Sequence, residues 1–351
     1  MNKIITIDKR KIGEGYSPFI LAEMSGNHNQ SIERAFSIIE SAAECGCDGI
    51  KLQTYTPDTI TLDIKEREFV VSDTSSLWYG ESLYDLYGKA MTPWEWHKPI
   101  FDKCKELGLI CFSTPFDETS VDFLEELNPP AYKIASFENI DMPLLKKVAS
   151  LGKPVIMSTG MSTISELDES VQTLKDNGCK DIILLKCTSS YPASPENSNL
   201  TTIPHMRDLF DLQIGLSDHT LGIGASIASI ALGASFIEKH FTLSRQEGGV
   251  DSAFSMEPDE MKMLVEESRR AWEAIGEIDY GGSEAEKPLR QFRRSIYIAE
   301  DMKAGDIFST VNLRNIRPGL GLPPKFYEML LGKKINKNAQ KGTPMTWDLL
   351  G

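Results

Sequence analysis

The stretch IGLSDHTLGIGASIASIALGASFIEKHFT, residues 214–242, contains two apolar runs that each end in a histidine. His219 follows the first run and His240 ends the second, and the segment between them has helical length and is rich in alanine, glycine and isoleucine. A buried strand, a helix and a second buried strand in this order are typical of a βαβ unit, whose strands are parallel. We therefore expect the two histidines at the same edge of a parallel sheet.

The same pattern of helix, glycine, short loop and buried strand recurs along the chain, as in KELGLICF and ASLGKPVIM. Eight such units within about 275 residues predict a (β/α)₈ TIM barrel, an α/β fold of about 250 residues. A doubly wound open sheet is the structural alternative, but it usually carries a GxGxxG turn after its first strand. The corresponding stretch here is EMSGNHNQS. The eight predicted strands are 19–25, 49–55, 109–116, 131–136, 154–160, 182–189, 213–219 and 235–242.

Three segments fall outside this repeat. Residues 56–92 are longer than an ordinary βα loop and are expected to carry short helices or a flap over the barrel mouth. Residues 277–293 are polar and interrupted by glycine and proline, so they are predicted to be a linker after a catalytic domain spanning 1–276. Residues 294–351 alternate short apolar runs with turns, which predicts a small β-rich domain that packs on the barrel or on a partner.

Composition narrows the function classes. The 351 residues carry a net charge of −14, which argues against nucleic acid or an anionic membrane as partner. No apolar segment has the length of a membrane helix, and the first residues do not resemble a secretion signal. Six scattered cysteines without a CxxC pair are typical of reduced thiols, so we expect a cytoplasmic protein.

Polar residues gather where the predicted strands end, which is where barrel enzymes place their active sites. Lysines and hydroxyl groups in that position form charge-assisted hydrogen bonds to carboxylate or phosphate, so we expect an anion site. The alternative for each lysine is a side chain that simply reaches solvent. The strand-end residues include Glu23, Lys51, Gln53, Ser113, Thr114, Lys133, Ser136, Glu138, Ser158, Thr159, Lys186, Thr188, Ser189, Tyr191, Ser217, Asp218 and Lys239.

Two histidines at one barrel edge can hold a divalent cation, because imidazole suits Mn, Zn, Fe or Co. Either histidine alone would more often be a hydrogen-bonded core residue. His28, in GNHN, is either a supporting group or a turn residue. Two chemistries fit an anion site beside a metal: condensation of phosphoenolpyruvate with an aldehyde, or an aldolase reaction through a lysine Schiff base.

Eight motifs in order give a family resemblance. They are AEMSGNHNQS, IKLQTY, STPFD, YKIAS, MSTGM, CTSSYP, GLSDHT and EKHFT, across residues 22–242. Together they resemble the sialic acid synthase family, which condenses phosphoenolpyruvate with an N-acetylated amino sugar. The tail is similar to the antifreeze-like (SAF) domain of that family. The loop LSRQEGGVDSAFSMEPDE, 243–260, resembles the branch that makes pseudaminic acid from 2,4-diacetamido-2,4,6-trideoxy-L-altrose, with phosphate released by C–O cleavage. Neuraminate or legionaminate synthesis by the same chemistry, and a non-catalytic sugar-binding protein, are the alternatives.

The resemblance also implies residue roles. His219 and His240 would bind Mn²⁺ or Mg²⁺ and take part in catalysis with Glu23. Arg317, from the small domain of the other subunit of a domain-swapped homodimer, would reach the sugar's acetamido group. Ser189 stands where neuraminate synthases commonly have asparagine. Residues expected to contact phosphoenolpyruvate are Lys51, Lys133, Ser136, Ser158, Ser189 and Ser217, and those expected on the sugar side are Glu23, Gln53, Thr114, Tyr191 and Asp251; Glu138 is counted with the substrate-binding residues.

Overall fold

Residues 3–74 and 76–351 are described by a computed structural model of the chain. The chain divides into two compact units, one ending at Gly276 and one from Glu277 to Gly351. Each unit has its own hydrophobic core and is described separately.

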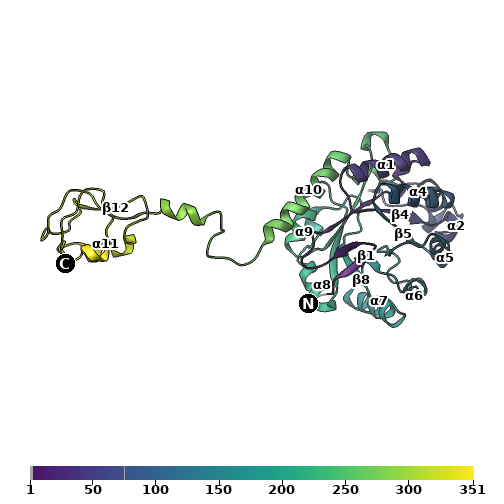
Figure 1. The fold of residues 1–351 in the computed structure, drawn as a ribbon. Helices are drawn as coiled ribbons and strands as arrows, with labels where there is room; N and C mark the ends of the chain where they lie inside the picture. Colours follow the sequence, from purple (N-terminus) through teal and green to yellow (C-terminus); the bar gives the residue numbers. More distant parts are fainter. Residues whose placement is uncertain (1–2, 75) are drawn as a thin grey trace. The chain divides into compact units, whose positions relative to one another are not determined.

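The first unit is a closed barrel of eight parallel strands, as the sequence predicts (Figure 1). The order around the barrel follows the chain, and β10 closes the ring by pairing with β3 through the register His240↔Glu23. The strands are β3 (Phe19–Glu23), β4 (Gly49–Thr54), β5 (Ile110–Pro115), β6 (Tyr132–Ile134), β7 (Val155–Ser158), β8 (Ile182–Cys187), β9 (Gln213–Asp218) and β10 (Phe236–His240).

Helices follow the strands and cover the outside of the barrel. Several begin where side chains can cap them: the Ser31 hydroxyl accepts the Arg34 amide at 3.2 Å, and Thr163 and Glu166 form a capping box. The helix over residues 202–210 contains Pro204, which is tolerated because it falls in the first turn. The helices are α1 (Ile32–Glu44), α4 (Trp94–Glu106), α5 (Glu118–Leu127), α6 (Met142–Ala149), α7 (Ile164–Asp176), α8 (Thr202–Phe210), α9 (Gly224–Ala231) and α10 (Pro258–Ile275).

Two apolar layers hold the barrel. Outward-facing strand residues such as Ile50 and Leu52 pack against the helices. Inward-facing residues such as Phe19, Phe112 and Phe236 fill the interior together with isoleucines of an N-terminal hairpin, β1 (Ile5–Ile7) and β2 (Arg10–Ile12). The apolar filling occupies the amino-terminal half of the strands, so the polar ends of the strands are left at the opposite mouth.

The segment between β4 and α4 carries short helices, as expected for residues 56–92. These are α2 (Pro57–Ile60), a 3-10 helix at Arg67–Phe69 and α3 (Leu83–Ala90). The Ser82 hydroxyl caps α3 by accepting the Asp85 amide at 3.2 Å.

The second unit contains a 3-10 helix at Lys287–Phe292 and an antiparallel pair, β11 (Ser295–Ile298) and β12 (Leu313–Ile316), followed by α11 (Tyr327–Leu330). Ile296, Phe308, Leu313 and Met345 are among the buried residues of its core.

None of the helices in residues 3–74 and 76–351 combines the length and apolarity needed to cross a membrane. All six cysteines are buried and unpaired.

Candidate active site

Four ionisable side chains lie inside the barrel at the carboxyl end of the strands. Alternation along each strand turns Glu23, Lys51, Lys133 and Glu238 inward, and all four are at most 4% exposed. Charged groups this deep are stable only when they are paired and hydrogen-bonded. These four side chains and the groups that pair with them therefore form the floor of the barrel mouth, called the floor below.

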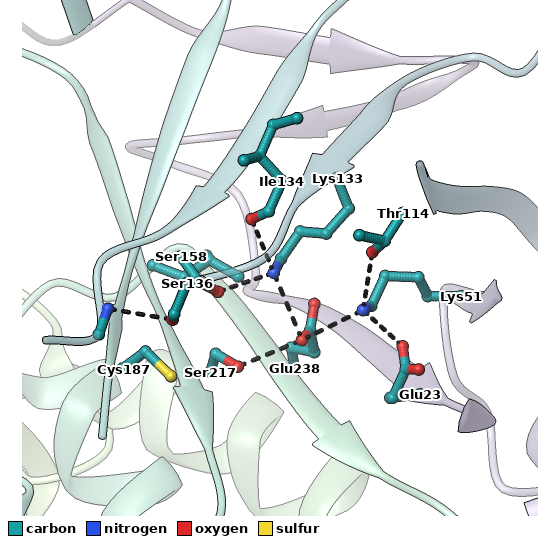
Figure 2. Close-up of polar contacts among 12 residues, drawn as sticks. Glu23, Lys51, Thr114, Lys133, Ile134, Ser136, Ser158, Cys187, Ser217 and Glu238 are labelled. Atoms are coloured by element: carbon teal, nitrogen blue, oxygen red, sulfur yellow. Dashed lines mark hydrogen bonds and ion pairs between the residues drawn. The ribbon is translucent and has the colours of Figure 1, made fainter. Parts of the chain in front are cut away.

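The two lysines share one carboxylate (Figure 2). Lys51 Nζ lies 2.7 Å from a Glu23 oxygen and 3.6 Å from Glu238 Oε1, and Lys133 Nζ lies 3.7 Å from the same Glu238 oxygen. Glu238 also accepts the Ser217 hydroxyl at 3.2 Å. Lys51 donates to Thr114 Oγ1 at 3.2 Å. The floor thus holds two ammonium and two carboxylate groups in one connected network.

Burial and pairing set the charge states of this network. Burial raises the pKa of Glu23, although Lys51 opposes the shift. Burial alone would lower the pKa of Lys51, but Glu23 and Glu238 raise it above its ordinary value. Burial lowers the pKa of Lys133 even though Glu238 opposes this. Burial works against ionisation of Glu238, yet Lys133 and Lys51 hold its pKa below the ordinary value. Lys51 and Glu238 are accordingly charged at neutral pH.

Hydroxyl groups surround the lysines on one side. Lys133 Nζ donates to Ser158 Oγ at 2.7 Å, and the Gly160 amide donates to Ser136 Oγ at 3.0 Å. Ser189 lies against the same turn, because a Cβ built at Gly160 would collide with its hydroxyl. Ammonium groups with several small hydroxyl donors form a cradle for phosphate or carboxylate.

The two predicted histidines lie side by side at the mouth, at the ends of the neighbouring strands β9 and β10. Their ring centroids are 5.3 Å apart and the ring planes differ by 62°. His219 Nδ1 lies 2.9 Å from the Thr188 carbonyl oxygen, which can only accept, so that nitrogen carries the proton and Nε2 is free to bind a cation. Burial lowers the pKa of His240 well below its ordinary value, and its buried Nδ1 has no hydrogen-bond partner.

Burial alone would lower the pKa of His219, but Cys187 and the Thr188 carbonyl raise it above its ordinary value. These features fit a divalent cation that is held by both imidazoles and that competes with a proton at His219. No set of three or more His, Cys, Asp or Glu side chains within 3–74 and 76–351 is arranged to hold a metal. A cation bound here would thus keep coordination positions open for water or a substrate oxygen.

A second polar chain runs from Glu23 to the histidines. Gln53 Nε2 donates to Glu23 Oε1 and to Ser25 Oγ, each at 3.1 Å. The Ser25 hydroxyl in turn donates to Asp251, whose carboxylate lies 3.5 Å from His240 Nδ1. Burial raises the pKa of Asp251. These hydrogen-bonding groups border the histidine pair on the side away from the hydroxyl cradle's serines.

Tyr191 forms an aromatic wall beside the histidines. Its ring centroid lies 4.5 Å from that of His219 and 5.2 Å from that of Phe254. An aromatic face next to hydrogen-bonding groups is a surface suited to the carbon side of a sugar.

The remaining predicted site residues occupy less central positions. Glu138 follows β6, is partly buried, and has an unpaired buried carboxylate oxygen; burial raises its pKa to about 7. Arg317 belongs to the second unit and is exposed there, directly after β12. His28 hydrogen-bonds with the Gln30 amide and lies 3.3 Å from the Thr92 hydroxyl, and its ring packs on Trp96. His28 thus packs beneath α3 and α4 as a structural residue.

Two strand-end lysines do not belong to the anion site, contrary to the expectation from sequence. Lys186 turns outward and donates to the Cys187 carbonyl and the Thr188 hydroxyl. Lys239 also turns outward and pairs with Asp218 at 3.1 Å. The inward positions are taken by Cys187 and Glu238, which sequence reasoning missed. Strict alternation would have found both, since Glu238 lies two residues before His240 and Cys187 two before Ser189.

The family scan gives two matches along the chain. Residues 38–280 match the NeuB family model, and residues 293–351 match the SAF domain model.

Named relatives cover nearly the whole chain. A pseudaminic acid synthase of Campylobacter jejuni is 43% identical, over 92% of this chain and 94% of that protein. An N,N'-diacetyllegionaminic acid synthase of Campylobacter jejuni is 38% identical, over 91% of this chain and 96% of that protein. The crystal structure of an N-acetylneuraminic acid synthetase from Leptospira borgpetersenii, in complex with citrate, superposes with a TM-score of 0.74 at 30% identity, covering 82% of this chain and 95% of that one.

Proposed function

We propose, since this chain belongs to the NeuB family, that it condenses phosphoenolpyruvate with 2,4-diacetamido-2,4,6-trideoxy-L-altrose and water to give pseudaminic acid and phosphate. Because named relatives in this family are synthases of nonulosonic acids, the chain is an enzyme of that kind. The choice of sugar rests on the resemblance of the 243–260 loop and on the higher identity to the pseudaminic acid synthase. The observation that carries the chemistry is the lysine and hydroxyl floor beside the histidine pair.

The phosphoenolpyruvate half of the site is assigned to the floor. Lys51 and Lys133 would hold the carboxylate and phosphate, and Ser136, Ser158, Ser189 and Ser217 would donate further hydrogen bonds. Because these groups are already positioned by the barrel, they place the substrate without reorganisation during the reaction.

The sugar half of the site is assigned to residues that border this floor and the histidine pair. Gln53, Thr114, Tyr191 and Asp251 would orient the open-chain sugar so that its aldehyde carbon faces C3 of phosphoenolpyruvate. Glu138 is placed with the substrate-binding residues at the rim. Holding two reactants in this way can lower a barrier by about 7–11 kcal/mol.

The relative positions of the two substrates determine which bonds form and which break. C3 of phosphoenolpyruvate would form a bond to the aldehyde carbon, which leaves C2 electron-poor, and water would add to C2. Glu23 would accept one proton of this water, and the aldehyde oxygen would take up one proton to become a hydroxyl, so that no net proton is gained or lost in these two transfers. The C2–O bond to phosphate then breaks, the phosphate leaves with the remaining proton, and the oxygen from water becomes the C2 ketone oxygen. A Mn²⁺ or Mg²⁺ ion held by His219 and His240 would supply Lewis acidity toward the carbonyl oxygen of the sugar.

The experiment uses a panel of acetamido sugars with phosphoenolpyruvate and Mn²⁺, and follows phosphate release and product mass. We expect turnover with the diacetamido altrose at rates well above those with the acceptors for neuraminate and legionaminate. Phosphoenolpyruvate labelled with ¹⁸O at the bridging position should place the label in phosphate, because the C–O bond breaks. Covalent trapping by borohydride with insensitivity to EDTA would indicate a Schiff-base aldolase instead. Sugar binding without phosphate release would indicate a binding protein.

We also propose that two chains form a domain-swapped homodimer in which Arg317 of one chain completes the site of the other. Charge supports this: residues 1–276 hold 25 basic and 42 acidic residues, net −17, whereas residues 277–351 hold 12 and 9, net +3. Loops at the barrel mouth also expose apolar side chains, among them Phe137, Met161 and Leu221, each at least 58% exposed.

Mixing two inactive variants tests the swap. Arg317→Ala retains an intact barrel and His240→Ala retains an intact small domain. In a swapped mixed dimer the first barrel meets the second small domain, so activity should return after mixing and subunit exchange. Without swapping, neither chain of the mixed dimer has a complete site and activity should stay absent. The six free thiols support a reducing, cytoplasmic compartment for this assembly.

A further inference from the structure

A short segment of the long β4–α4 connection carries a tryptophan toward the barrel mouth. The segment, residues 76–82, is fixed at its end by a hydrogen bond from the Val71 amide to the Glu81 carbonyl at 3.0 Å and one from the Gly80 amide to the Val71 carbonyl at 2.9 Å. Trp78 lies within it and is partly buried, while its neighbours Leu77 and Tyr79 are about half exposed or more.

Trp78 contacts two elements that carry the sugar half of the site. Its indole Nε1 donates to the Val250 carbonyl oxygen at 3.0 Å, and the next residue along the chain is Asp251. Its ring lies against Tyr191, with centroids 5.9 Å apart, and Tyr191 in turn packs on His219. One side chain therefore joins the loop that supplies Asp251 to the aromatic wall.

The contact lies beside a pocket. Both segments line this pocket of about 590 Å³, through Leu77 and Trp78 and through Val250 and Ala253. The Trp78 hydrogen bond to Val250 and the ring contact with Tyr191 therefore join the two segments next to an open space.

We propose that Trp78 is a positioning residue for the acceptor sugar, acting through Val250–Asp251 and Tyr191. This inference rests on the function proposed above. It assigns to Trp78 the sugar half, because Trp78 contacts Val250, next to Asp251, and Tyr191, whereas Lys133 is held by Ser158 and Glu238. If Trp78 only stabilised the barrel, its replacement would change the KM values for both substrates by similar factors.

The test compares Trp78→Ala, Trp78→Phe and the wild type by initial rates with each substrate varied. We expect Trp78→Ala to raise the KM for the sugar about tenfold or more, with the KM for phosphoenolpyruvate within about twofold. Trp78→Phe keeps a ring against Tyr191 but lacks the indole N–H, so its sugar KM should lie between the two. Tyr79→Ala, one residue away and 58% exposed, is the matched control and should behave as wild type.

Hydrogen exchange separates this inference from the proposed function. In Trp78→Ala, amides in residues 246–254 should exchange faster than in wild type, whereas the strands of the barrel should not change. That readout needs no turnover, so a wild type inactive with every acetamido sugar would reject the function and leave the contacts of Trp78 testable. Equal rises in both KM values, or unchanged exchange in 246–254, would overturn the role of Trp78.

Discussion

The Gly160 amide donates to the Ser136 hydroxyl at 3.0 Å, and this contact brings the turn after β7 against the loop after β6. A Cβ at Gly160 would lie 2.7 Å from Ser136 Oγ and would collide with Ser189 Oγ. Only glycine lets the backbone approach both hydroxyls this closely. The hydroxyl cradle thus depends on a residue that has no side chain of its own.

Gly160→Ala should therefore weaken binding of phosphoenolpyruvate. The methyl group displaces Ser136 and Ser189, so we expect the KM for phosphoenolpyruvate to rise about tenfold with little change in the sugar's KM. Steady-state phosphate release measures both. Gly224→Ala is the control, because a Cβ there meets nothing within 4 Å. Unaltered phosphoenolpyruvate kinetics in Gly160→Ala would place the anion elsewhere.

Glu238→Gln should destabilise the fold. Glu238 is the carboxylate shared by Lys51 and Lys133, and its loss leaves buried ammonium charge with less compensation. Removing one member of a buried ion pair costs about 3–5 kcal/mol, so the denaturant midpoint should fall sharply. Glu247→Gln, whose partner is Arg34 and whose carboxylate is half exposed, should cost about 1 kcal/mol or less. Similar midpoints for the two variants would contradict the role of Glu238 in the network.

The sequence predicts the barrel and much of its site because both depend on local patterns. Buried runs ending in His219 and His240 identify neighbouring strands, and those rings do lie together. The prediction was wrong at Lys186 and Lys239 because proximity to a strand end does not say which face a side chain takes. Applying the two-residue period backward from His240 gives Glu238 an inward position and Lys239 an outward one.

Other features have no local signal. The N-terminal hairpin consists of two three-residue strands, too short for a pattern, and it is held by contacts with barrel residues such as Phe19 and Phe236. The Trp78–Val250 hydrogen bond joins residues 172 positions apart. Such contacts follow from how loops pack in three dimensions, and a single sequence does not encode them in any short window.

Glu138 should make stability depend on pH. Burial raises its pKa in the folded protein from 4.5 to about 7. Below about pH 4.5 the Glu138 carboxyl is protonated in the folded and the unfolded protein, so it does not change the free energy of unfolding. As pH rises toward 7 the carboxyl ionises first in the unfolded chain, so the folded state loses up to about 3 kcal/mol of stability. Glu138→Gln should match wild type near pH 4.5 and be more stable above pH 7. Urea unfolding at both pH values checks this, and parallel stability curves would be the contrary result.

Removing one histidine of the pair should reduce catalytic activity more than removing the Glu23 carboxylate. Loss of one imidazole leaves a cation with a single ligand from the pair, so His219→Ala and His240→Ala should be nearly inactive even with added Mn²⁺. Glu23→Gln removes one proton acceptor, whose contribution to the rate is about 10²–10⁴-fold, and should retain residual turnover.

EDTA treatment of the wild type should abolish phosphate release, and Mn²⁺ should restore it. Bound metal, measured by atomic absorption after dialysis against Mn²⁺, should be lost in the histidine variants and kept in Glu23→Gln, since Glu23 lies 2.7 Å from Lys51 and contacts Gln53 and Ser25 rather than the rings. Near wild-type turnover without metal would remove the Lewis-acid role and leave the two imidazoles as hydrogen-bonding groups.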